Sequence, residues 1–198
     1  QVTGFKENGK ELETVLKSGE SLSSEYVLFS IGREADLSCV EGLDIEQERG
    51  RLIVNDYMET SIEGVYAAGD INGISMLAHS AFKMGEAAAG NALGGREEVR
   101  VENTPKCVYT LPEIASVGLT EEEALKKYGK IRTGRFNFGA NGRAIASSEE
   151  EGFVKVICDD KYGEILGVHI IGSKATEMIS AGVILMEMET TIEEASEI

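Results

Sequence analysis

A short apolar run that ends in Gly69-Asp70 and leads into a helix-period segment constrains the fold of this 198-residue chain most. The run is Val65-Tyr66-Ala67-Ala68, which has the composition of a buried strand. From about residue 77 to 93, apolar residues recur every three or four positions, and Gly94-Gly95 predicts the end of a helix. The pattern therefore predicts a strand, a loop and a helix, with Asp70 at the carboxyl end of the strand.

One face of the predicted helix consists mostly of small residues. Small side chains let a helix backbone pack very close to a sheet or a ligand. Tight helix packing without any ligand is the plainer interpretation. The face comprises Ala78, Ala81, Phe82, Gly85, Ala88, Ala89 and Ala92.

Residues 1–32 have a β-like pattern. Residues 2–5 and 12–16 read as short strands separated by polar turns, which predicts a small antiparallel meander. Residues 26–31 are almost wholly apolar and favour a strand covered on both faces, ending at Gly32. A polar connector follows, with one further strand candidate at residues 52–54.

Beyond residue 100 the pattern becomes α+β. Thr120 and Glu123 form a capping-box pattern for a helix that ends near Gly129, and Ser173 is the expected cap of a longer helix. The apolar stripe of that longer helix is Ala175, Met178, Ile179, Gly182, Leu185 and Met186. The predicted strands are residues 106–109, 114–117, 136–138, 153–158 and 164–171, the last two joined by a turn at 159–163.

Composition excludes several functional classes. The formal charge of −16 and the absence of a Lys/Arg stripe argue against a nucleic-acid partner. No apolar run approaches the roughly 18 residues that cross a bilayer, so no membrane association is expected. Cys39, Cys107 and Cys158 are far apart in sequence, which favours separate thiols in a reducing, cytoplasmic compartment and predicts no metal site.

Asp70 is the residue whose position suggests ligand chemistry. A carboxylate at the carboxyl end of a strand can accept hydrogen bonds from sugar-like hydroxyls, and a following helix N-terminus favours negative charge. A Gly-Asp pair also occurs for turn chemistry alone. The spacing by itself leaves both interpretations open.

Several strings extend the pattern into a family resemblance. TSIEGVYAAGDI at 60–71 followed by MLAH at 76–79 resembles the second flavin-binding motif of the pyridine nucleotide-disulfide oxidoreductases. VYTLPEIASVGLT at 108–120, NGRA at 141–144, GFVK at 152–155 and GVHIIG at 167–172 resemble the interface domain of the same family, and SIGR at 30–33 matches too. Within this family, Met-Leu-Ala-His is typical of the dihydrolipoamide dehydrogenase subfamily.

The resemblance implies a fold and cofactor contacts. The fold class is α+β, a C-terminal dimerisation (interface) domain preceded by partial α/β FAD- and NAD-binding segments. Asp70 would bind the ribityl chain of FAD, and Met76, Leu77, Ala78 and His79 would lie against its ring. Gly32 would lie where NAD passes over the flavin, although a strand-ending turn explains that glycine equally well.

The resemblance also implies which parts the chain lacks. It has no G-x-G-x-x-G fingerprint, no closely spaced Cys pair and no His-Pro pair, so no catalytic residue is assigned. The family's catalytic His and Glu would fall just beyond Ile198. We therefore expect a fragment that is inactive alone and need not retain FAD.

The expected organisation has three parts. Residues 1–33 would end an NAD-binding domain, residues 34–102 would form the C-terminal part of an FAD-binding domain, and residues 103–198 would form a truncated dimerisation domain. The intact parent would be a homodimer that transfers electrons from dihydrolipoamide through a disulfide and FAD to NAD. Its partners would be the lipoyl-bearing subunits of 2-oxo acid dehydrogenase or glycine cleavage complexes.

Two alternatives remain from the sequence. The chain could act only as an association module, built from residues 106–198. It could also be a fragment of another FAD-dependent disulfide reductase, such as a mercuric or glutathione reductase.

Overall fold

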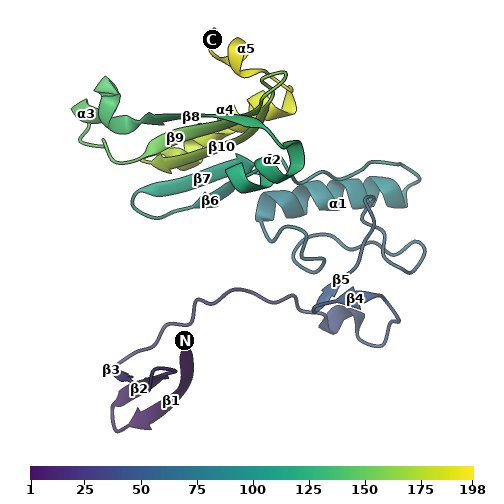
Figure 1. The fold of residues 1–198 in the computed structure, drawn as a ribbon. Helices are drawn as coiled ribbons and strands as arrows, with labels where there is room; N and C mark the ends of the chain where they lie inside the picture. Colours follow the sequence, from purple (N-terminus) through teal and green to yellow (C-terminus); the bar gives the residue numbers. More distant parts are fainter. The chain divides into compact units, whose positions relative to one another are not determined.

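The computed structural model describes residues 1–198, which divide into two compact units, Gln1–Glu34 and Ala35–Ile198 (Figure 1). The first unit is an antiparallel three-stranded sheet of order β1-β2-β3. Its strands are β1 (Val2–Asn8), β2 (Glu11–Leu16) and β3 (Ser21–Ser24). This confirms the first two strands of the predicted meander, whereas the third strand, β3, was not predicted. No side chain of the unit is fully buried.

The apolar run at residues 26–31 is not a strand, which corrects the sequence prediction. The residues have no regular secondary structure, and the side chains of Leu28 and Ile31 are 90% and 92% exposed. Phe29 does contact the sheet, with its ring 5.0 Å from that of Phe5 in an edge-on arrangement. A buried strand needs hydrogen-bonded neighbours and covered faces, and the first unit supplies neither to this run.

The second unit begins with short, irregular elements. A single 3-10 turn, η1 (Ser38–Val40), precedes a minimal hairpin of β4 (Gln47–Glu48) and β5 (Arg51–Leu52). Arg49 and Gly50 both have positive φ angles and form the turn between β4 and β5. The strand predicted at residues 52–54 therefore exists only at its first residue.

Residues 65–68 are extended but do not form a strand. Tyr66 makes one isolated bridge with Glu59, and Ala67 N–H donates to the carbonyl of Met58 at 3.0 Å. Ala67 is buried, as expected of the run. The backbone of residues 65–68 makes only a few hydrogen bonds with nearby residues, too few to form the predicted strand.

Helix α1 (Ala78–Ala92) confirms the predicted helix, but only Ala88 of the predicted face is among its buried residues. The buried residues are Ser80, Met84, Ala87, Ala88 and Asn91, whereas Phe82 of the predicted face is 75% exposed. Asn91 is buried because its side-chain amide donates to the carbonyls of Tyr57 and Glu97, at 3.0 and 2.8 Å. Satisfied polar side chains therefore occupy positions that a hydrophobic pattern assigns to solvent.

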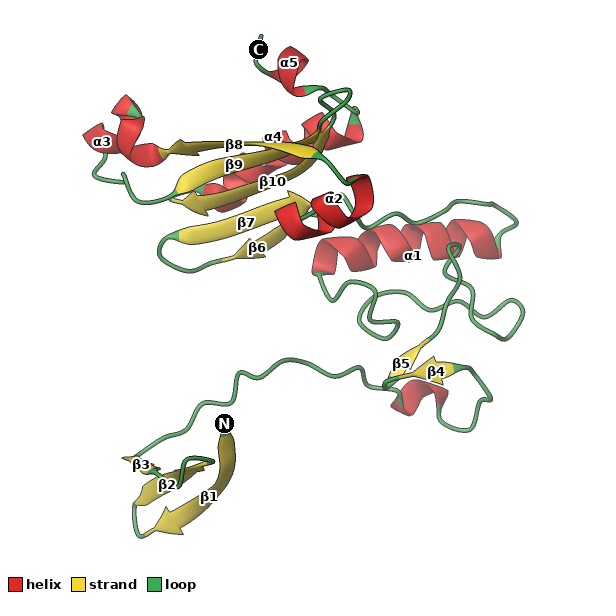
Figure 2. Ribbon diagram, in the orientation of Figure 1, coloured by secondary structure: helices red, strands yellow, loops and turns green.

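A five-stranded antiparallel sheet dominates the rest of the second unit (Figure 2). Its order is β6-β7-β10-β9-β8. The Asp159 carboxylate closes the predicted β9–β10 turn by accepting N–H groups of Lys161, Tyr162 and Glu164 at 2.8–2.9 Å. The strands are β6 (Lys106–Val108), β7 (Glu113–Gly118), β8 (Ile131–Asn137), β9 (Phe153–Asp159) and β10 (Ile165–Gly172).

Two helices cover opposite faces of this sheet. Ile179 and Gly182 of α4 (Ala175–Glu187) lie against Val168 and its neighbours. Ala124 of α2 (Glu121–Tyr128) packs on Ile157, whose side chain points away from α4 because neighbouring residues of a strand alternate between faces. The shorter helices are η2 (Phe138–Ala140), α3 (Gly142–Ala146) and α5 (Ile192–Ala195). The arrangement confirms the α+β fold class.

Helix α4 starts differently from the prediction. Lys174, with a left-handed φ of 61°, is the N-cap in place of Ser173, and it provides no side-chain cap. Glu113 of β7 caps the helix instead, accepting from the Thr176 N–H at 3.0 Å and the Thr176 hydroxyl at 2.7 Å. A residue 63 positions away does what the sequence pattern assigned to a neighbour.

None of the helices in residues 1–198 combines the length and apolar character that crossing a bilayer requires.

Candidate functional site

The turn that carries Asp70 lies directly against the start of α1. Gly69 has a φ of +84°, and a side chain there would place its Cβ 3.3 Å from the Cβ of Ala81. Glycine adopts this backbone angle without strain and leaves room for Ala81. The turn closes through hydrogen bonds from Asn72 N to Gly69 O and from Gly73 N to Asp70 O, both 3.2 Å. Asp70, which is half-buried, is thus presented beside the first turn of a helix.

The N-terminus of α1 has the electrostatic character of a site for a polar or anionic group. Its N-cap, Leu77, provides no side-chain acceptor, and no acid lies in the first turn. The hydroxyls of Ser75 and Ser80 bond to each other at 2.7 Å. The backbone donors at such a helix start favour negative charge.

The predicted contacts at residues 76–79 divide between two environments. Met76 and Leu77 are half-buried before the helix, whereas Ala78 and His79 begin it and are exposed. The imidazole Nε2 of His79 lies 2.9 Å from the carbonyl oxygen of Pro105, just before β6. His79 therefore ties the start of α1 to the start of the five-stranded sheet, a role that the sequence did not suggest.

Gly32 belongs to the first unit. It is exposed, its φ is +118°, and a Cβ there would meet no atom within 4 Å. Its backbone angle rather than crowding favours glycine at this position. The structure describes it within its own unit, and the role toward NAD stays a prediction.

Arg51 supports the Asp70 turn from the side, and sequence reasoning missed it. Its guanidinium Nη1 donates to the carbonyl of Gly73 at 3.1 Å, and its chain lies so close that a Cβ on Gly73 would come within 2.0 Å of Arg51 Cδ. The Leu52 N–H also donates to the carbonyl of Ile71 at 3.0 Å. No local pattern links Arg51 to a turn so much later in the chain, so residue spacing carried no usable signal.

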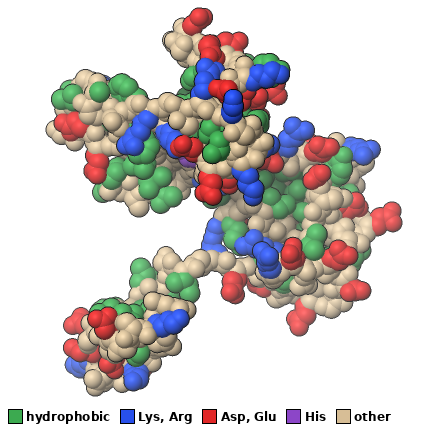
Figure 3. Space-filling view, in the orientation of Figure 1, with side chains coloured by type: hydrophobic (Ala, Val, Ile, Leu, Met, Phe, Trp, Pro, Cys, Tyr) green, Lys and Arg blue, Asp and Glu red, His purple; other side chains and the backbone are tan.

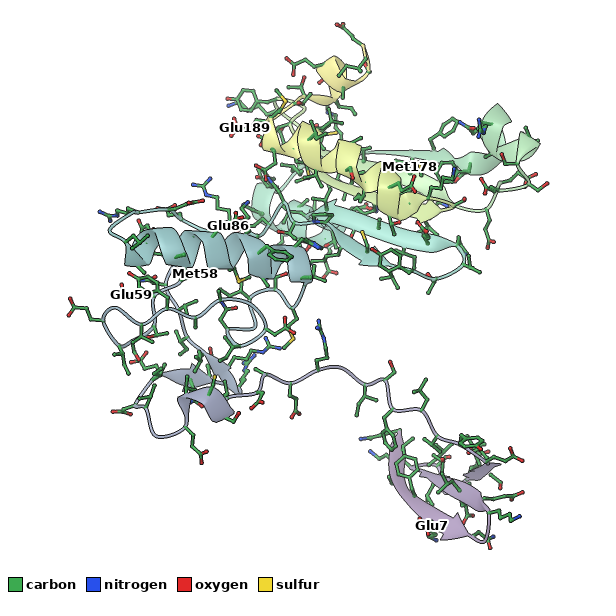
Figure 4. All side chains as sticks on the ribbon, turned by 180° about the vertical axis from the view of Figure 1, so that it is seen from behind. Glu7, Met58, Glu59, Glu86, Met178 and Glu189 are labelled. Atoms are coloured by element: carbon green, nitrogen blue, oxygen red, sulfur yellow. The ribbon has the colours of Figure 1, made fainter.

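Beneath the same turn, Asn72, Met58 and Met84 are buried, and the sequence did not single them out as site residues. Figure 4 labels Met58 close to α1, in agreement with its packing against Met84 and Ala88. The only sequence feature that could have pointed to this cluster was the position of Met84 within the predicted helix.

The cysteines lie apart in three settings. All are free thiols, with Cys39 exposed, Cys107 half-buried and Cys158 buried. Burial raises the pKa of the Cys107 and Cys158 thiols, so each has less of the reactive thiolate form. No group of three or more His, Cys, Asp or Glu side chains that could hold a metal occurs in residues 1–198.

His169 has a structural contact. Its ring Nε2 lies 2.9 Å from the carbonyl oxygen of Leu119, at the connection between β7 and α2. Glycine at position 167 makes room for this connection, because a Cβ there would lie 2.2 Å from the same carbonyl oxygen.

Charged side chains are spread over the face of the protein seen in Figure 3, where acidic and basic residues are mixed.

Family models match nearly the whole chain. Residues 1–85 match the pyridine nucleotide-disulphide oxidoreductase model, and residues 104–197 match the dimerisation domain of the same family. The chain therefore belongs to the pyridine nucleotide-disulphide oxidoreductase family.

Within that family the chain is similar to dihydrolipoyl dehydrogenases. It is 38% identical to one from Bacillus subtilis over 91% of this chain and 41% of the relative, and 37% identical to one from Thermus scotoductus over 97% and 43%. The chain thus spans about two-fifths of the length of these relatives.

Solved structures agree. LpdA from Mycobacterium tuberculosis superposes with a TM-score of 0.91 at 28% identity, covering 100% of this chain and 44% of that one. The HOCl-induced flavoprotein disulfide reductase RclA from Escherichia coli shares the fold with a TM-score of 0.83 at 21% identity, covering 96% of this chain and 45% of that one.

Proposed function

We propose that this chain supplies a flavin-facing segment and the dimer-forming domain of a dihydrolipoamide dehydrogenase. The complete enzyme would transfer electrons from protein-bound dihydrolipoamide through a disulfide and FAD to NAD. The observation that carries the proposal is the Asp70 turn, in which a carboxylate follows a glycine pressed against the first turn of α1. Similarity to dihydrolipoyl dehydrogenases along 91% of the chain supports it.

The residues around Asp70 fit a group that carries hydroxyls and gains negative charge. The Asp70 carboxylate would accept hydrogen bonds from the ribityl hydroxyls of FAD. The N-terminus of α1 would favour negative charge on the flavin ring by up to about 2 kcal/mol in a partly buried geometry. When bound, FAD supplies the two-electron acceptor. Met76, Leu77, Ala78 and His79 would lie along the ring, and Gly32 would allow NAD to pass close by.

Flavin binding to this chain is testable by titration. Because the chain spans two-fifths of its relatives, we expect weak binding that does not survive gel filtration. Millimolar FAD should shift the backbone amide signals of residues 69–79, and Asp70→Asn should weaken that shift while Asp44→Asn leaves it unchanged. Unshifted amides in the wild-type chain would refute the assignment of Asp70, and yellow colour retained through gel filtration would refute the expected weakness.

We also propose that the chain alone is inactive. Its thiols are all free and belong to separate parts of the fold, with Cys39 in η1, Cys107 in β6 and Cys158 in β9. A dihydrolipoamide oxidase needs two cysteines close enough to form a reducible disulfide. An assay with dihydrolipoamide, NAD and added FAD should show no turnover, and measurable turnover would contradict this proposal.

Association is a second candidate function, favoured by an exposed apolar edge. The hairpin of β6 and β7 exposes Val108, Tyr109, Leu111 and Ile114 by 50%, 81%, 100% and 40%. Apolar surface of this kind is commonly covered in homodimers. Sedimentation should detect a dimer of this chain, and Leu111→Lys should weaken it. A monomer at high concentration would count against association.

For the complete enzyme we propose further partners on the same grounds. They are the lipoyl-bearing subunits of 2-oxo acid dehydrogenase or glycine cleavage complexes, with the enzyme in the cytoplasm. Similarity to proteins named dihydrolipoyl dehydrogenase supports the lipoyl substrate. Co-purification of the complete enzyme with a lipoylated subunit would test it, and recovery of the enzyme without any such subunit would oppose it.

A further inference from the structure

The turn that presents Asp70 rests on two buried thioethers. The Gly69 N–H donates to Met84 Sδ at 3.4 Å, and the same sulfur lies 3.4 Å from the side-chain nitrogen of Asn72. Met58 Sδ lies 3.8 Å from that nitrogen. Met84 Sδ therefore accepts from donors on both sides of Asp70, whereas Met58 Sδ accepts only from Asn72, which follows it.

Asn72 connects the sulfurs to the backbone on both sides of the turn. Its Nδ2 also donates to the carbonyl of Ala67 at 3.0 Å, and its Oδ1 accepts from the Ile74 N–H at 3.1 Å. One side chain thus links the residues that precede Asp70 to those that follow it.

These hydrogen bonds matter for stability because the groups that form them are buried. Met84 is fully buried, and Met58 and Asn72 are 2% and 6% exposed. A buried donor that loses its acceptor bears the cost of desolvation, because water cannot replace the partner. Met58 also holds a φ of +66°, a conformation that non-glycine residues keep only where the surroundings enforce it.

We infer that Met84, Met58 and Asn72 are positioning residues that fix the Asp70 turn through hydrogen bonds to sulfur. The inference rests on the proposed flavin-facing role of Asp70 and adds the residues that hold the Asp70 turn in place. A thioether is a neutral acceptor, so it anchors the turn without burying a negative charge beside Asp70. The turn would be ordered before any ligand arrives, which lowers the cost of binding.

Exchange of the Gly69 amide hydrogen tests the anchor without any flavin. Met84→Leu keeps the size of the side chain but removes the acceptor, so exchange at Gly69 should accelerate by about fivefold or more. Met84→Gln restores an acceptor oxygen and should return exchange toward the wild-type rate. Met186→Leu makes the same chemical change in α4 and should leave Gly69 unaffected. Equal rates in wild type and Met84→Leu would overturn the inference.

A measurement on the unmodified chain keeps the test independent of variant folding. With methyl-labelled methionine, the Gly69 amide proton should show a nuclear Overhauser effect to the Met84 ε-methyl group. Absence of that signal would also overturn the inference.

FAD titration separates this inference from the proposed function. If Met84 positions Asp70 for flavin, Met84→Leu should reduce the FAD-induced shifts of residues 69–79, Met84→Gln should recover them, and Met186→Leu should not change them. If FAD shifts no amide in any variant while Gly69 exchange responds as expected, the proposed flavin role fails and the sulfur anchor stands. If FAD shifts the wild-type amides equally in Met84→Leu, the positioning role fails and the flavin role stands.

Discussion

Helix starts in the five-stranded domain show how single side chains satisfy backbone donors. Thr120 N–H donates to Glu123 Oε2 at 2.8 Å while the Thr120 hydroxyl oxygen accepts from the Glu123 N–H at 3.3 Å. Thr191 and Glu194 repeat this reciprocal pair at α5. The backbone N–H and the hydroxyl of each Thr donate to the Glu carboxylate, and these bonds lower the pKa of Glu123 and Glu194 by stabilising their charged forms.

Glu113 should make stability depend on acid pH. Hydrogen bonds from the Thr176 N–H and hydroxyl lower the pKa of Glu113 in the folded state. A depressed folded pKa contributes stability that is present above the unfolded value, about 4.3 for Glu, and is lost as the pH falls through the folded value. Glu113→Gln should therefore flatten the decline of unfolding free energy below about pH 4.3 in urea titrations.

The control for this prediction is Glu177→Gln. It removes a charge from the first turn of α4 but leaves the bonds between Glu113 and Thr176 in place. An equal flattening in both variants would show that general charge, not the cap, causes the effect.

Gly152 should tolerate no side chain. Its φ is +113°, and a Cβ would lie 1.8 Å from the carbonyl oxygen of Ile171 on the neighbouring strand. Gly152→Ala should cost at least about 2 kcal/mol of unfolding free energy, because strained backbone and a clash add. Gly134→Ala in β8, where a Cβ would meet nothing within 4 Å, should cost far less. Similar denaturation midpoints for the two variants would contradict the structural reason.

At the scale of elements, α4 is held by one narrow stripe. Ala175, Ile179 and Gly182 are buried on the sheet, and Gly182 brings the helix so close that a Cβ would lie 3.1 Å from Val168 Cβ. Met178, which the sequence placed in the same stripe, is 36% exposed. The helical periodicity of the sequence therefore predicted the buried stripe. Which residues lie at the margin of that stripe depends on how the helix packs on the sheet.

Ile179→Ala should be strongly destabilising. The side chain is 1% exposed within the main core, and truncation there leaves a cavity as well as losing apolar burial. The expected cost is about 2–5 kcal/mol of unfolding free energy, measured by urea denaturation. Ile184→Ala, at 59% exposure on the same helix, should cost less than about 1 kcal/mol. Equal losses would contradict the packing explanation, because Ile→Ala does not lower helix propensity at either position.

At the scale of the whole molecule, burial is unequal between the two units. All of the buried core residues belong to Ala35–Ile198, and none belongs to Gln1–Glu34. A three-stranded sheet without a buried face is marginal in water. Stability of the chain should therefore come almost wholly from the second unit.

Amide hydrogen exchange should show this inequality. Amides of β1 and β2 should exchange at least ~100-fold faster than those of β9 and β10, since local opening of a weakly buried sheet costs little. Deleting residues 1–34 should leave the denaturation midpoint of the second unit unchanged, because that unit contains the entire core. Slow exchange in β1, or a lowered midpoint after the deletion, would contradict this expectation.

The sequence by itself determined the features that depend on neighbours along the chain. The capping box at Thr120, the Asp159 turn, helix α1 and four strands of the five-stranded sheet follow from spacings of a few residues. The strand predicted at residues 136–138 was placed too late, because β8 begins at Ile131. The family motif around Gly69-Asp70 is equally local, which is why the α+β class and the family were recognisable from residues alone.

Tertiary structure alone decided what depends on distant partners. The apolar runs at 26–31 and 65–68 did not become strands, because a strand forms only where another strand supplies hydrogen bonds along its length. The cap that Glu113 provides to α4, the Met84–Asn72 contact and the Arg51–Gly73 contact join residues 12 to 63 positions apart. Such contacts arise from packing in three dimensions, for which spacing along the chain carries no signal.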